Sequence, residues 1–142
     1  ILNINIIYPI LLIKNFKKIS IKEKKVKKII NIGSMAGQNG GEFAGDLYSI
    51  SKAGIINLTK SIAKKYGKKN IICNCINPGP IDTSMTKNWP KKIKKNLISK
   101  FNVRRKSLGT VYDISNACLF LASDKSNYIQ GSELNINGGL VI

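Results

Sequence analysis

The sequence of 142 residues contains no histidine, three cysteines and two arginines. Without histidine it can form neither a Ser–His–Asp triad nor a His-based zinc site, and no imidazole can act as a general base. Only Cys73 and Cys75 lie close together, so the chain has neither a disulfide framework nor a Cys-x-x-Cys pair. We therefore predict no metal site, buried packing roles for the cysteines, and a reducing, cytoplasmic compartment.

Arginine is scarce although the chain is strongly basic, with a net charge of +17 from 24 Lys+Arg and 7 Asp+Glu. Lysine, isoleucine and asparagine, which have A- and T-rich codons, are abundant, so we interpret the lysine excess as a bias of the genome. A nucleic-acid-binding protein is expected to retain arginine for bidentate contacts, and only Arg104 and Arg105 are present. We predict no nucleic-acid partner, whereas an acidic protein partner is compatible with the charge.

No hydrophobic run is long enough to cross a bilayer, which takes about 20 residues. The apolar opening run, residues 1–13, also lacks the basic start of a secretory signal. We therefore predict no membrane partner. The chain begins with Ile1 in the middle of an apolar pattern, which we interpret as the sign of a fragment.

What is present is the pattern of one α/β domain, with a hydrophobic content of 43%. Apolar residues at helical spacing predict helices over residues 1–18, 47–66, 90–101 and 110–122. Short apolar runs predict buried strands over residues 26–34, 71–77 and 133–136. Strands that alternate with helices indicate a parallel sheet with helices on both faces. The glycine-rich residues 35–46 are predicted to form a loop, and Gly67 to cap the second helix.

Three segments follow the predicted strands and should therefore meet at one edge of the sheet. They are Gly33-Ser34, the run from Pro78 to Thr83, and the turn from Asn137 to Gly139. In open parallel sheets, ligands bind beyond the carboxyl ends of the strands. The sequence thus predicts a binding site at this edge.

The helix after the first of these segments carries Tyr48 and Lys52, which lie four residues apart and so share a face. An ammonium beside a phenol favours the phenolate, which makes the phenol a usable general acid or base near neutral pH. Ser34 could donate a hydrogen bond to a substrate oxygen on which negative charge develops. A Tyr–Lys pair at this spacing arises by chance in roughly half of such lysine-rich chains, so the pair alone favours a solvated helix face. The strand-end segments at the same edge of the predicted sheet favour the functional interpretation.

The order of motifs INIGS, YSISKAG, NPGPIDT, FLASD and QGSELNINGG resembles the C-terminal portion of classical short-chain dehydrogenases/reductases. The resemblance covers essentially the whole chain. Among the members of this family, the sequence is most similar to the 3-oxoacyl-[acyl-carrier-protein] reductases. The resemblance implies a Rossmann-like, doubly wound parallel sheet. It also implies that residues 1–142 are the C-terminal portion of a single domain, with the last three strands and their helices, truncated at the N-terminus.

The resemblance also implies roles for individual residues. Tyr48 would donate the proton to the carbonyl oxygen, Ser34 would position that oxygen, and Lys52 would bind the nicotinamide ribose and tune Tyr48. Asn5, which fits the fourth catalytic position better than Asn3, would hold a water that relays protons to Lys52. The cofactor-binding residues would be Tyr48, Lys52, Pro78, Gly79, Ile81 and Thr83, the last of them on the nicotinamide carboxamide.

The function that these roles imply is NADP(H)-dependent reduction of a 3-oxoacyl thioester on acyl carrier protein, in fatty acid synthesis, by a homotetramer. The spacing of Tyr48 and Lys52 favours carbonyl over enoyl reduction, because enoyl-reductase relatives space the pair by seven. Two alternatives stay open: a dehydrogenase of the same family that acts on a sugar, polyol or other small alcohol, and an inactive fragment that serves only as a structural or binding unit.

Two features qualify this interpretation. The chain contains no glycine-rich dinucleotide loop and no residue that would select NAD or NADP, so NAD is possible and the preference for NADP is inferred from the family. The basic segment from Pro90 to Phe101 matches the family's mobile lid, with Trp89 and Met85 on the acyl path. The alternative for this segment is a helix that lies on a membrane surface.

Overall fold

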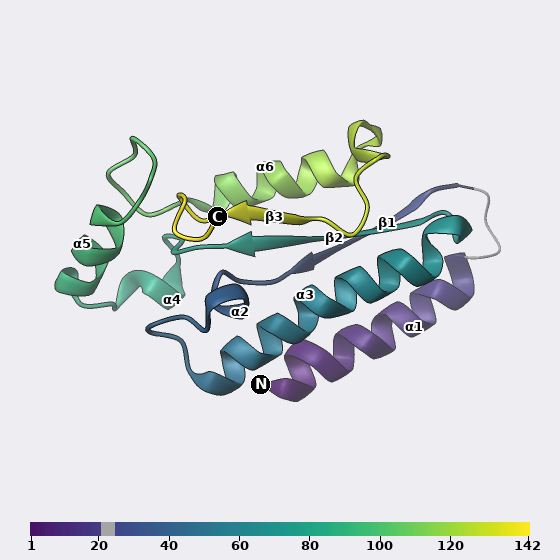
Figure 1. Ribbon diagram of the computed structural model, residues 1–142, viewed down its shortest axis with the longest axis horizontal. Helices are drawn as coiled ribbons and strands as arrows, with labels where there is room; N and C mark the ends of the chain where they lie inside the picture. The colour runs from purple at the N-terminus through teal and green to yellow at the C-terminus, as the bar shows by residue number, and fades with distance from the viewer. Residues whose placement is uncertain (21–24) are drawn as a thin grey trace.

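Three parallel strands form the centre of the computed structural model, which describes residues 1–20 and 25–142 (Figure 1). The strands β1 (Lys27–Ile32), β2 (Ile71–Pro78) and β3 (Glu133–Ile136) pair in that order. Ile29 of β1 lies opposite Cys73 of β2, and all but the last residue of β2 are buried. A central strand that helices cover on both faces needs apolar or internally satisfied side chains throughout. The parallel sheet predicted from the sequence is therefore confirmed.

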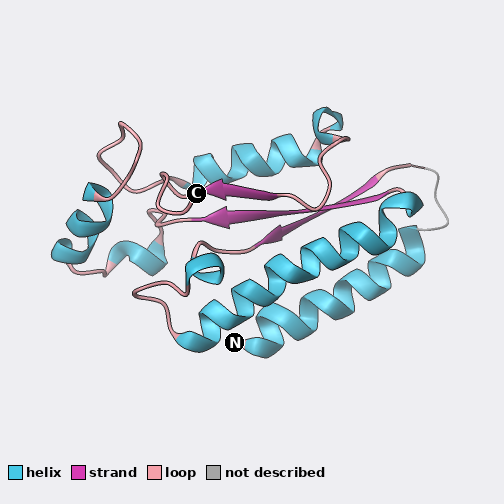
Figure 2. Ribbon diagram, viewed as in Figure 1, coloured by secondary structure: helices cyan, strands magenta, loops and turns pink. Residues whose placement is uncertain are grey.

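Two long helices cover one face of the sheet and run side by side beneath it (Figures 1 and 2). A π-helical turn (Asn3–Ile7) leads into α1 (Tyr8–Ser20), and α3 extends over Asp46–Tyr66. Ile13 of α1 and Ile62 of α3 pack on Ile71 of β2 in one buried cluster. Each such side chain stabilises the fold by about 1.5–3 kcal/mol relative to an exposed position.

The opposite face is covered by α6 (Val111–Ala122), whose Ala117 and Leu121 pack on Ile76 of β2. Thr110 caps this helix, and the Asp113 carboxylate accepts hydrogen bonds from the Thr110 backbone N–H at 2.6 Å and from Arg105 at 2.5 Å. These two bonds, together with one from the Thr110 hydroxyl, lower the pKa of Asp113 to about 2. The helix agrees with the one predicted over residues 110–122.

Short elements gather at the carboxyl end of the sheet (Figure 1). They are α2 (Ala36–Asn39), α4 (Ser84–Lys87) and α5 (Lys91–Ser99). The expectation of a plain loop over residues 35–46 is therefore wrong for its first part, because α2 forms there. The prediction of a helix to residue 101 is too long, since α5 ends at Ser99.

The end of α3 also differs from the prediction. Gly67 keeps a right-handed helical conformation, with a φ of −56°, and the chain continues into the 3-10 turn Gly67–Lys69. Asn70, with a φ of 59°, takes the left-handed position that ends the turn. Asparagine tolerates this conformation because its short polar side chain can bond locally. Within the described parts of the chain, no helix combines the length and hydrophobicity that a membrane crossing requires.

Candidate active site

Ser34 stands at the carboxyl end of β1 in a turn that is fixed to β2 on both sides. The Gly33 N–H donates to the Ile76 carbonyl at 2.8 Å, and the Met35 N–H donates to the Pro78 carbonyl at 3.0 Å. Ser34 Oγ accepts a hydrogen bond from the Ala36 N–H at 3.1 Å, and the residue is buried. The hydroxyl hydrogen is not used in that bond and can be donated to a ligand.

Tyr48 and Lys52 lie on the first turns of α3, as the sequence predicts. Lys52 Nζ is 5.7 Å from the centroid of the Tyr48 ring and donates a hydrogen bond to the Ile32 carbonyl at 2.9 Å. Burial lowers the pKa of Lys52 below its ordinary value of 10.5, and the Coulombic influence of Cys75 opposes this shift. The ammonium is therefore held at the end of β1, two residues before Ser34.

Close packing of α2 on α3 brings the Ser34 turn to the Tyr–Lys pair. A Cβ added at Gly37 would lie 2.6 Å from the backbone carbon of Lys52, so only glycine permits this approach. The structure thus places the backbone of the Ser34 segment in direct contact with the backbone at Lys52. Three of the predicted site residues are brought to one end of the sheet.

Asn5 lies in the π-helical turn, where the Tyr8 N–H bonds to the Asn3 carbonyl. Its side-chain Nδ2 donates to Ser51 Oγ at 3.0 Å, and Ser51 Oγ donates to the Tyr48 carbonyl at 2.7 Å. π-helical turns are frequent at functional sites. The structure therefore links Asn5 to α3 through the fully buried Ser51, and the relay from Asn5 to Lys52 stays a prediction.

The predicted cofactor loop, residues 78–83, is rigidly held. The Gly79 N–H donates to the Ile136 carbonyl at 2.9 Å, and a Cβ at Gly79 would lie 2.6 Å from Asn137 Cα. Ile81 pairs with Gly109 in an isolated parallel bridge. Thr83 precedes α4, and its N–H donates to Thr86 Oγ1 at 3.1 Å. This loop presents its backbone at the edge where β2 and β3 end.

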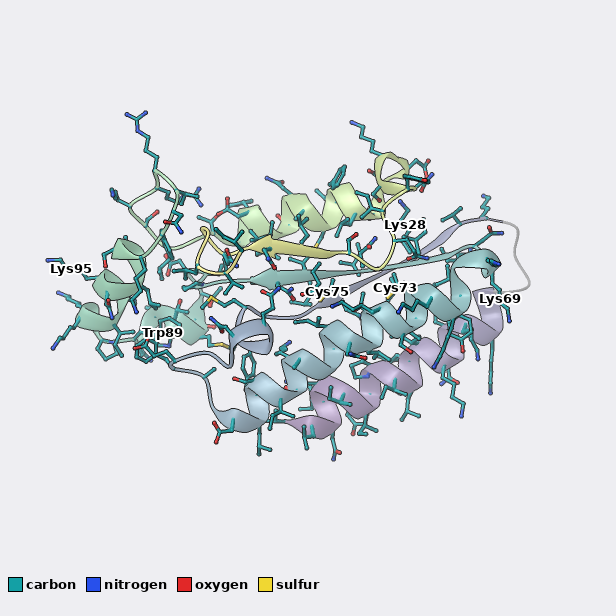
Figure 3. The ribbon with its side chains drawn as sticks, in the orientation of Figure 1. Lys28, Lys69, Cys73, Cys75, Trp89 and Lys95 are labelled. Atoms are coloured by element: carbon teal, nitrogen blue, oxygen red, sulfur yellow. The ribbon has the colours of Figure 1, made fainter. Side chains whose placement is uncertain are left out.

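A cavity of about 390 Å³ lies next to this loop. Ile81, Phe101 and Gly138 contribute to its wall, whereas Ser34, Tyr48 and Lys52 do not. We locate the candidate chemistry at the Tyr–Lys pair rather than in this cavity, because the cavity lacks a group suited to proton transfer beyond the paired Asp113 and Arg105. Trp89, at the entrance to α5, lies at the end of the molecule where the strands point (Figure 3).

The donor set at this edge fits one end of a nicotinamide dinucleotide. The Tyr48 hydroxyl and the Lys52 ammonium can both donate to vicinal ribose hydroxyls, and the loop after β2, fixed by hydrogen bonds, lies at the same edge. Among the residues that the structure describes, no three His, Cys, Asp or Glu side chains are grouped so as to hold a metal ion. Cys73 and Cys75 are fully buried, as predicted.

Several residues near the site were not predicted from the sequence. Ser51 connects Asn5 to α3, and Asn77, Glu133 and Gln38 form a hydrogen-bonded group behind the Ser34 turn. The even spacing of Cys73, Cys75 and Asn77 places all three on one strand face, which is the signal that could have drawn attention to Asn77. The partners of these residues depend on tertiary contacts that the spacing does not reveal.

Comparison with known proteins gives consistent matches. The family model described as "Enoyl-(Acyl carrier protein) reductase" matches residues 1–141. The chain is 42% identical over 112 residues to the 3-oxoacyl-[acyl-carrier-protein] reductase of Chlamydia muridarum (strain MoPn / Nigg), covering 79% of this chain and 44% of the relative. It is 39% identical over 123 residues to the enzyme of the same name from Haemophilus influenzae, covering 87% of this chain and 50% of the relative. The chain thus spans about half the length of the curated relatives it matches.

Solved structures match over nearly the whole chain. A 4-hydroxyisoleucine dehydrogenase complexed with NADH superposes with a TM-score of 0.89 at 30% identity, covering 99% of this chain and 57% of that one. A blue fluorescent protein from a metagenomic library, in complex with NADPH, gives a TM-score of 0.87 at 29% identity, with 99% and 55% covered.

Proposed function

The chain belongs to the short-chain dehydrogenase/reductase family, and from this premise we propose that the protein is an NADP(H)-dependent reductase of 3-oxoacyl thioesters on acyl carrier protein. The observation that carries the proposal is the Tyr48–Lys52 pair, with Lys52 bonded to the Ile32 carbonyl at the end of β1. The relatives named as 3-oxoacyl-[acyl-carrier-protein] reductases support the substrate class.

When bound, the nicotinamide supplies the hydride that reduces the carbonyl carbon. The residues of this chain protonate the oxygen of that carbonyl and stabilise its negative charge. Tyr48 donates its phenolic proton to the oxygen, and Ser34 donates a hydrogen bond that stabilises the developing negative charge. The Lys52 cation, 5.7 Å from the Tyr48 ring centroid, stabilises the negative charge left on the tyrosine oxygen. Asn5 completes the group by holding a water that returns protons to Lys52.

The residues after β2 complete the proposed cofactor site. Pro78, Gly79 and Ile81 would hold the nicotinamide ring with their backbone, and Thr83 would bond its carboxamide. The hydrogen bonds that fix this loop to β3 and to Gly109 support the assignment, because a rigid surface orients a bound ring without a further loss of entropy.

The description of the matching family model raises enoyl reduction as another possibility within the family. Tyr48 and Lys52 are four residues apart, and enoyl-reductase relatives space the pair by seven, so we propose carbonyl reduction. A second candidate is oxidation of a small hydroxylated compound with NAD. The likeness to a 4-hydroxyisoleucine dehydrogenase complexed with NADH favours this candidate.

Steady-state kinetics on the full-length form of the protein separate these activities. We expect acetoacetyl-acyl carrier protein with NADPH to give the highest kcat/KM, and crotonyl-acyl carrier protein, the enoyl substrate, to give no oxidation of NADPH. The third set of assays measures the oxidation of polyols and hydroxylated amino acids with NAD. A kcat/KM for any of these compounds above that for the acetoacetyl thioester would contradict the proposed substrate class.

We further propose that α1 and α3 pack against their copies in a homotetramer. Ile4 and Leu12 on the first helical segment are each 68% exposed, and Ile50 on α3 is 61% exposed. Exposed apolar residues this numerous on neighbouring helices mark an interaction surface. We expect Leu12→Asp to lower the molar mass measured by light scattering, and Tyr128→Asp, at an exposed residue outside both helices, to leave it unchanged. A full-length protein that is monomeric at micromolar concentration would contradict the proposal.

A further inference from the structure

A buried polar group lies behind the Ser34 turn, on the face of the sheet that α3 covers. Figure 3 shows Cys73 and Cys75 between β2 and α3, and Asn77 follows them on the same strand face. Asn77 is fully buried. Its Nδ2 donates to Glu133 Oε2 at 2.9 Å and to Asn135 Oδ1 at 3.3 Å, and its Oδ1 accepts from the Cys75 thiol at 3.3 Å.

Glu133 holds this group together from β3. Its Oε2 also accepts from Gln38 Nε2 of α2 at 2.8 Å, and its Oε1 pairs with Lys60 of α3 at 2.6 Å. Burial alone would raise the pKa of Glu133, but hydrogen bonds from Lys60, Gln38 and Asn77 outweigh it and lower the pKa. The side chain is therefore a carboxylate at neutral pH, and both of its oxygens can only accept hydrogen bonds.

This carboxylate decides which way the Asn77 amide faces. An amide can present either its oxygen or its nitrogen to a partner, and the hydrogen-bond network selects the orientation. Because Glu133 can only accept, the Asn77 nitrogen must face it. The Asn77 oxygen is then turned toward Cys75 and toward the backbone of Gly33.

The space between Gly33 and Asn77 admits no side chain at position 33. A Cβ added at Gly33 would lie 2.1 Å from Asn77 Oδ1 and 2.9 Å from Cys75 Sγ. The Gly33 backbone thus packs against the Asn77 amide oxygen. Gly33 lies between Ile32, whose carbonyl holds Lys52, and Ser34. A change in the orientation of Asn77 would therefore move both the Ile32 carbonyl and Ser34.

We propose that Glu133 is a positioning residue for the Ser34–Lys52 site: its carboxylate orients the Asn77 amide, and the Asn77 oxygen sets the place of the Gly33 backbone. Glu133 touches neither substrate nor cofactor in this scheme. The effect on catalysis rests on the proposed reductase function, whereas the orientation of Asn77 does not.

The test uses the full-length protein and two variants at the carboxylate. Glu133→Gln keeps the shape but replaces one oxygen with an NH₂ group. Because Lys60 can only donate, we expect the Gln oxygen to stay on Lys60 and the NH₂ group to face Asn77, so that the Asn77 amide turns to present its oxygen. We expect kcat to fall about tenfold with KM within about twofold, because small misplacements of reacting groups cost more in rate than in binding. Lys60→Gln is the control. It removes the ion pair on Oε1 without touching Asn77, and its kcat should stay within about twofold of the original.

A double variant tests the pairing itself. Adding Asn77→Asp to Glu133→Gln exchanges the carboxylate and the amide, so an oxygen again faces Cys75 and Gly33. We expect the exchange to restore kcat to within about threefold of the original, since the hydrogen-bond complementarity returns. If the single variant does not fold, a folded and active double variant supports the proposal, and a double variant that also fails overturns it.

The infrared S–H stretching band of Cys75, assigned by its loss in Cys75→Ala, reports the orientation of Asn77 independently of activity. A thiol that donates to the amide oxygen absorbs at lower frequency than one that has lost this acceptor. We expect the band to rise in Glu133→Gln and to return in the double variant. An unshifted band in folded Glu133→Gln, or a restored band without restored kcat, would overturn the proposal. Failure of the proposed function would instead appear as an absence of reductase activity in the original protein, with the band still measurable.

Discussion

Replacing Tyr48 with phenylalanine is expected to lower kcat for acetoacetyl-thioester reduction at least about 100-fold in the full-length protein, because general acid catalysis contributes 10²–10⁴-fold. The substitution removes one hydroxyl and keeps the ring 5.7 Å from Lys52 Nζ. The cation–π contact and the Lys52 bond to Ile32 should both persist, so the variant should keep its melting temperature. The fall in kcat would then result from the loss of the proton donor and not from a loss of stability.

A matched control is Tyr112→Phe, which removes the same group from an exposed position on α6. This variant should keep kcat and KM. Steady-state oxidation of NADPH, followed by absorbance, and a thermal melt of each variant provide the comparison. If Tyr48→Phe retained more than about a tenth of the original kcat, Tyr48 could not be the general acid.

Gly33→Ala should have the second large effect, on stability as well as on rate. The added Cβ would lie 2.1 Å from Asn77 Oδ1 and 3.2 Å from Ile56 Cγ1, so either the turn or the strand beneath it must move. Overpacking of this kind costs about 1–3 kcal/mol of unfolding free energy. Because the displaced backbone carries Ser34 and the Ile32 carbonyl, kcat should fall by at least about tenfold as well.

Gly45→Ala is the control for this substitution. A Cβ at Gly45 would meet nothing within 4 Å, and its φ of −68° suits any residue. Chemical denaturation should therefore give this variant an unfolding free energy within about 1 kcal/mol of the original, the usual range of an N-cap change from glycine to alanine. Equal losses for the two alanine variants would show that the space behind Gly33 is not tightly packed.

The long, regular elements were predicted well from the sequence because their patterns are local. The apolar spacing that predicts a helix over residues 47–66 agrees with α3 at Asp46–Tyr66, and the apolar run over residues 71–77 agrees with β2. Prediction failed where a single turn decides the structure. Asn70, rather than Gly67, takes the left-handed conformation, and α2 forms inside a glycine-rich segment because Gly37 packs against the backbone of Lys52.

The residues of the candidate site also fall into those that local patterns predict and those that they do not. Ser34, Tyr48 and Lys52 could be selected because strand ends and a helical spacing of four place them on one edge. Glu133 and Asn77 are 56 positions apart, and their hydrogen bond depends on the register that sets β3 beside β2. No local pattern encodes that register. The placement of these three residues at one edge was therefore predictable, whereas the hydrogen-bonded group behind them was not.

The measurement that tests the central claim most directly is transfer of deuterium from NADPH labelled at C4 of the nicotinamide to acetoacetyl-acyl carrier protein. The reaction is run with the full-length protein, and the product is examined by mass spectrometry. The account predicts a 3-hydroxybutyryl thioester that carries one deuterium on the carbinol carbon, formed by the original protein and lost in Tyr48→Phe. A recovered thioester that is unreduced, or a 3-hydroxybutyryl thioester without deuterium on its carbinol carbon, would contradict it.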